Sequence, residues 1–149
     1  MKTKTMLAAL LICFAAAIVP TLASGDAGSA VQADVTHLGN DVASAHTTLV
    51  TDSSNVTTAA QAGDKPAVKA ALTTLRSDAS TLLPAVQADR KQLVTDLQAA
   101  RAAHITGLGA DVKAALKADR AQIKEIRQAI RQARHAVQTL RQASVPTQS

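Results

Sequence analysis

Apolar residues recur at alternating steps of three and four residues through most of this 149-residue chain. The first such run includes Val31, Val35, Leu38, Val42 and Leu49. This heptad spacing places the apolar side chains along one face of an α-helix, whereas a half-buried strand would need alternation every second residue. The pattern therefore predicts an all-α chain.

The most regular run lies in the C-terminal third of the chain. Its apolar face, the predicted core seam, consists of Val112, Leu116, Ile123, Ile126, Ile130, Val137 and Leu140. Asp119 interrupts this seam. A polar residue at a seam position usually specifies the register of helix packing rather than a functional site, and we interpret Asp119 in that way.

Helix-breaking residues divide the pattern into three helices. Gly63 ends the first helix, Asp64 can cap the second, and Pro66 suits its first turn. Pro84 predicts a kink or short break in the second helix, and Gly107 with Gly109 predicts the next connection. The predicted domain spans 31–143 between a flexible entry (24–30) and a tail (144–149), with helices at about 30–62, 65–105 and 110–143.

Short connections favour an antiparallel, up-down-up three-helix bundle or coiled coil. The alternative is one long, kinked helical rod that dimerises through the same seams. In the bundle the first and third helices run parallel. Asp34 and Asp41 would then flank the first seam on the side that faces the third helix, so the signs of the charges match those of Lys113, Arg120, Arg127 and Arg134.

The N-terminus has the three parts of a secretory signal peptide. Lys2 and Lys4 precede an uncharged, apolar segment that ends before Pro20, and small residues follow. The segment is shorter than the roughly 20 residues that span a bilayer. We therefore expect a signal peptide over 1–23 and export to the periplasm, the bacterial envelope or the cell exterior. An uncleaved N-terminal anchor is the alternative.

Cleavage after Ala23 would remove Cys13 and Phe14, the only cysteine and the only aromatic residue. The remaining chain could form no disulfide or cysteine metal site, and it would have no aromatic platform for stacking bases or sugars. It contains one glutamate, Glu125, and no serine in a strand-turn-helix elbow. We predict no catalytic residues, no cofactor and no small-molecule substrate.

The sequence also predicts no metal site. No two of the four histidines, His37, His46, His104 and His135, are four residues apart, and we find no carboxylate that completes a ligand set with them. We interpret each histidine as a helix-end or core residue.

Basic residues form the most specific surface pattern, recurring every three or four positions of the third helix. Residues 101–149 hold nine basic and three acidic side chains, whereas residues 25–100 hold five basic and eight acidic ones. At 1.5 Å per residue the pattern extends over about 40 Å. This candidate polyanion-binding surface, the basic stripe, consists of Lys113, Lys117, Arg120, Lys124, Arg127, Arg131, Arg134 and Arg141.

Two interpretations of the basic stripe are open. It could bind nucleic acid, lipopolysaccharide, teichoic acid or anionic lipid. It could instead be a solvated flank of the helix that pairs with the acidic helices. The sequence favours the second interpretation, because no aromatic residues lie between the basic residues of the stripe. We thus expect a non-enzymatic exported protein acting by coiled-coil interaction, through self-association or an envelope partner. A polyanion-binding module and a periplasmic holdase-type chaperone are the alternatives.

Overall fold

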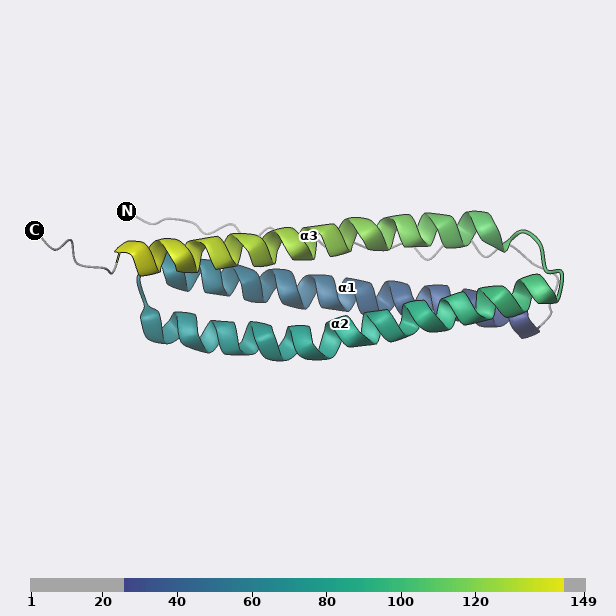
Figure 1. Ribbon diagram of the computed structural model, residues 1–149, viewed down its shortest axis with the longest axis horizontal. Coiled ribbons are helices and arrows are strands. Elements are labelled where there is room, and N and C mark those ends of the chain that lie inside the picture. The colour runs from purple at the N-terminus through teal and green to yellow at the C-terminus, as the bar shows by residue number, and fades with distance from the viewer. Residues whose placement is uncertain (1–25, 144–149) are drawn as a thin grey trace, which may run out of the picture.

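The computed structural model describes residues 26–143, which form three α-helices and no strand. Helix α1 spans Asp26–Gln61, α2 spans Lys65–Ala102 and α3 spans Leu108–Ala143. The chain reverses direction at both connections, so the helices lie side by side in an up-down-up bundle (Figure 1). The predicted all-α class and three-helix bundle are confirmed. The predicted signal peptide (1–23) and tail (144–149) lie outside the described residues.

The connection between α1 and α2 follows the sequence signals closely. Gly63 has a φ of +73°, a left-handed conformation that glycine adopts without steric cost. Asp64 then caps α2, because its Oδ1 accepts a hydrogen bond from the amide of Ala67 at 2.9 Å. Pro66 lies in the first turn, where its missing amide hydrogen costs nothing. The predicted cap and turn are both confirmed.

The connection between α2 and α3 lies earlier than expected. Helix α2 ends at Ala102, and α3 begins at Leu108, so Gly109 is helical. The reversal uses two left-handed residues, Gly107 with a φ of +93° and His104 with a φ of +55°. His104 is exposed, so of the two expected positions for a histidine, helix end or core, the core position is wrong for this residue.

Pro84 does not break α2, which is continuous from Lys65 to Ala102. Of the two predicted alternatives, the short break is therefore wrong, and Ser80 and Thr81, which could have capped a restarted helix, do not do so. Both hydroxyl groups instead donate to the carbonyl oxygen of Ser77, at 2.7 and 3.2 Å. Proline in a helix interior removes one backbone hydrogen bond and bends the helix, and Figure 1 shows that α2 is not straight.

Helix α1 is the central element of the bundle. It packs closely against both α2 and α3, whereas α2 and α3 hardly approach each other. Figure 1 shows α1 between the other two helices over much of the length of the bundle. The burial follows this arrangement, since Val31, Val42, Leu49 and Val56 on α1 have no exposed surface. The three helices thus form an open array rather than a closed triangle.

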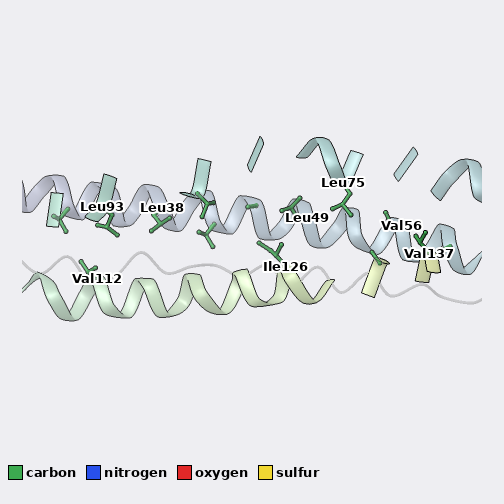
Figure 2. Close-up of a cluster of buried hydrophobic side chains, with 14 of the residues drawn as sticks. Leu38, Leu49, Val56, Leu75, Leu93, Val112, Ile126 and Val137 are labelled. Carbon is green, nitrogen blue, oxygen red and sulfur yellow. The ribbon is translucent and has the colours of Figure 1, made fainter. Parts of the chain in front are cut away.

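The hydrophobic cluster of the core is aliphatic and runs the length of the bundle (Figure 2). On α3, Val112, Ile126 and Val137 are buried. Four further seam residues are partly buried and pack against this core: Leu116, Ile123, Ile130 and Leu140. The seams thus contact each other within one chain, and the chain is not the extended rod considered as the alternative. Among the described residues, Val94 is the only large hydrophobic side chain that is exposed.

Candidate functional surfaces

All eight side chains of the basic stripe are exposed. The steps of three and four residues place them on one side of α3, away from the core seam. Among residues 26–143 the ion pairs join His37 to Asp89 and His46 to Glu125, so none involves the basic stripe. The stripe is therefore a surface of cationic groups that the described part of the chain does not neutralise.

The acidic residues of α1 do not face α3 as the charge pattern suggested. Asp34 lies beside Asp96 and Asp89 of α2, and Asp41 lies beside Asp89. The expected position of Asp34 and Asp41 beside the basic residues of α3 is therefore wrong. The heptad pattern identifies which side chains flank a seam but not how far each helix is rotated, and the central position of α1 turns these flanks toward α2.

Carboxyl groups of α1 and α2 meet at three levels of their interface. Asp34 lies against Asp96, Asp41 against Asp89, and Asp52 against Asp78. At the Asp34 and Asp52 levels the neighbouring carboxyl group favours the protonated form. The sequence predicted that the acidic residues of α2 lie on a helix. Which carboxyl groups of α1 they face depends on the antiparallel register of the two helices, which the sequence did not predict.

Burial raises the pKa of Asp34, and the hydrogen bond and charge of Asp96 raise it further. The same causes act on Asp52, whose pKa is raised first by burial and then by Asp78. Burial also raises the pKa of Asp119, although the positive charge of Arg90 on α2 opposes the shift. The α1–α2 interface and the Asp119 site therefore hold carboxyl groups that resist ionisation.

One of these acidic levels includes a histidine. Nδ1 of His37 lies 3.2 Å from Oδ2 of Asp89, and Asp41 lies one helical turn after His37 on α1. One nitrogen of His37 and one oxygen of each aspartate all lie within 4.8 Å of one another. The prediction of no metal site overlooked the four-residue spacing of His37 and Asp41, which was a readable signal. No local pattern pointed to Asp89, which is brought in by the fold.

An open groove of about 530 Å³ separates the first part of α2 from the last part of α3. It exists because these two helices pack against α1 and not directly against each other. Its lining combines apolar residues (Val68, Leu72, Val137 and Leu140) with basic ones (Lys65, Lys69, Arg76 and Arg141). Arg141 belongs to the basic stripe, so the positive surface continues from α3 onto α2.

The described residues contain no helix that is both apolar and long enough to cross a membrane. Comparison with known protein families, curated proteins and solved structures found no significant match to this chain. The function must therefore be inferred from the basic stripe, the carboxyl groups between α1 and α2, and the groove between α2 and α3.

Proposed function

We propose that this protein is an exported, non-enzymatic helical protein that binds a polyanion through the basic stripe of α3. The observation that carries the proposal is that all eight basic side chains are exposed and that none has an ion-pair partner within residues 26–143. The sequence favoured a different interpretation, in which the basic stripe is a solvated flank neutralised by acidic neighbours. That interpretation requires Asp34 and Asp41 to lie beside α3, whereas both lie beside α2. Export is inferred from residues 1–23 of the sequence alone.

The chemistry of the basic stripe suits a repeating array of phosphates or other anions. Binding such an array releases condensed counterions, which supplies affinity without sequence-specific contacts. The stripe follows a straight helix for about 40 Å, so it could contact several successive anionic groups. Nucleic acid, lipopolysaccharide, teichoic acid and anionic lipid all present such arrays, and they differ in spacing and in whether an acyl phase is present.

The test compares two matched double variants. Arg127→Gln/Arg131→Gln removes two charges from the basic stripe, and Lys91→Gln/Arg101→Gln removes two exposed charges from α2. We expect the first variant to bind heparin, duplex DNA or anionic vesicles more weakly and to lower the magnitude of the salt-dependence slope by about one per lost contact. The α2 variant should bind nearly as wild type does. Equal affinities for all three proteins, with helicity unchanged by circular dichroism, would contradict the proposal.

Interaction with another helical protein or a second copy is a second candidate function. The specific observation in its favour is the wide separation of α2 and α3, which leaves a groove lined by four aliphatic side chains. A helix lying in that groove would bury more apolar surface in a bundle whose core contains no aromatic residue. Light scattering at several protein concentrations tests self-association. A monomer at every concentration would contradict binding of a second copy.

The holdase-type chaperone has less support than either candidate. A holdase would offer exposed apolar surface to unfolded clients. In the part of the chain that the structure describes, Val94 alone among large hydrophobic side chains is exposed, with a relative exposure of 53%. An aggregation assay with an unfolded client checks this alternative, which would be revived if the protein slowed aggregation.

A further inference from the structure

The α1–α2 interface presents a histidine and two carboxylates together at one level. His37 and Asp41 are four residues apart, a spacing that places both side chains on the same face of a helix, one turn from each other. Two ligands at this spacing can chelate one ion. The third group, Asp89, comes from the antiparallel helix α2, so the cluster joins two elements that are far apart in the sequence.

The distances are close to those of a metal site. The three ligand atoms lie within 4.8 Å of one another, and His37 Nδ1 is 3.2 Å from Asp89 Oδ2. Zinc binds histidine nitrogen and carboxylate oxygen at about 2.0–2.2 Å, which places neighbouring ligand atoms roughly 3–4 Å apart. A pair of ligand atoms at the 4.8 Å limit would have to close by about 1 Å to reach that geometry.

Solvent access at the cluster is graded. The side chain of His37 is 68% exposed, whereas that of Asp89 is 18% exposed. Asp41 is intermediate. An ion could therefore enter from the histidine side, meet two partly desolvated carboxylates, and keep water on its open side.

The charge balance around the cluster also favours a cation. Asp34 lies close to both Asp89 and His37, so three carboxyl groups lie around one histidine. Oδ2 of Asp89 is buried and has no hydrogen-bond partner, and within residues 26–143 it is paired only with Nδ1 of His37. No lysine or arginine forms an ion pair with these carboxylates within residues 26–143. A divalent ion would supply the charge and the coordination that the Asp89 oxygen lacks.

We infer that His37, Asp41 and Asp89 form a binding site for a divalent transition-metal ion of the zinc class, with water completing the coordination. One nitrogen and two oxygen donors suit zinc, cobalt(II) or nickel(II), whereas magnesium and calcium prefer oxygen donors alone. Because the ligands come from both helices, the ion clamps α1 to α2 and stabilises the folded bundle by an amount that grows with the logarithm of the free ion concentration above Kd. This site is separate from the basic stripe and does not depend on its function.

The experiment uses tag-free protein, so that no engineered histidines compete for metal. Zinc binding is measured by isothermal titration calorimetry and the thermal midpoint by circular dichroism, for wild type, His37→Ala, Asp89→Asn and His46→Ala. His46 is the matched control, because it also pairs with one carboxylate, Glu125, but has no second one beside it. We expect one zinc ion per wild-type chain, a rise in the thermal midpoint with zinc, and affinity lowered at least tenfold in the two site variants but not in His46→Ala.

Two results would overturn the assignment. One is a wild-type affinity no higher than that of His37→Ala, and the other is equal loss of affinity in His46→Ala. Since His37 is mostly exposed, its replacement leaves the core intact, and unchanged helicity in metal-free buffer verifies this. Cobalt(II) with proton NMR provides a second measurement. Paramagnetic shifts should appear on the ring protons of His37, and shifts confined to other histidines contradict the site.

Discussion

The carboxyl group of Asp52 on α1 is buried against that of Asp78 on α2. Burial and this neighbour both raise the pKa of Asp52 above its ordinary value of 3.8. The folded protein therefore binds a proton more tightly than the unfolded chain does. The resulting stability is fully present below pH 3.8 and is lost as pH rises through the higher folded-state pKa. Asp52 should thus destabilise the bundle at neutral pH.

Replacement of Asp52 by asparagine tests this effect. Asp52→Asn removes the charge and nearly preserves the shape, so we expect its thermal midpoint at pH 7 to exceed that of wild type by a few degrees, roughly 2–5 °C. The difference should shrink as pH falls through the folded-state pKa of Asp52, because the wild-type carboxyl group then becomes protonated. Exposed Asp111 in the first turn of α3 is the control, since Asp111→Asn removes a favourable interaction with the helix dipole and should lower the midpoint slightly. A midpoint for Asp52→Asn below that of wild type at pH 7 would refute the account of this pair.

Asp119 is a buried carboxyl group in the apolar seam of α3. Its relative exposure is 5%, and its Oδ2 has no hydrogen-bond partner. A buried acceptor left without a partner costs about 1–3 kcal/mol. We expect Asp119→Leu to increase the free energy of unfolding at pH 7 by a similar amount, measured by urea denaturation.

The same substitution tests the role of Asp119 in specifying register. If the carboxyl group has that role, Asp119→Leu should be more stable yet show a broader NMR spectrum or a mixture of oligomers. Asp119→Asn separates charge from polarity, because it removes the charge but keeps an unpaired polar group. A lower urea midpoint for Asp119→Leu than for wild type would show that Arg90 or an ordered water satisfies the carboxylate.

His104 adopts a left-handed backbone conformation in the connection between α2 and α3, with a φ of +55°. For a residue with a Cβ atom this conformation costs about 1–2 kcal/mol, and glycine avoids that cost. We expect His104→Gly to stabilise the protein by about 1 kcal/mol in urea denaturation. Ala103 is the control, because its φ of −82° is ordinary. Ala103→Gly should destabilise, and stabilisation by both substitutions would indicate a different cause.

Most of the fold could be predicted because local signals agreed with one another. The heptad steps identified the helices, and Gly63, Asp64 and Pro66 identified the first connection through their backbone preferences. The second connection was harder, since the reversal uses His104 rather than a second glycine, and histidine adopts a left-handed conformation far less often than glycine does. Pro84 predicted a disturbance in α2 but not that the helix would continue through it.

The candidate surfaces were predictable only where they depend on a single helix. The basic stripe could be read from spacing alone, because it lies on one side of α3. The carboxyl pairs and the cluster around His37 depend on the register and rotation of α2 against α1. Those quantities are set by packing along the whole interface, which places Asp89 beside His37 and turns Asp34 away from α3.

The salt dependence of polyanion binding tests the central claim most directly. Wild-type protein is titrated with duplex DNA or heparin between about 50 and 200 mM salt. If several side chains of the basic stripe contact phosphates together, the logarithm of the binding constant for duplex DNA should fall linearly with the logarithm of salt concentration, with a slope of about −4 or steeper. Binding that is absent at 50 mM salt, or a slope near zero, would contradict the claim that α3 is a polyanion-binding surface.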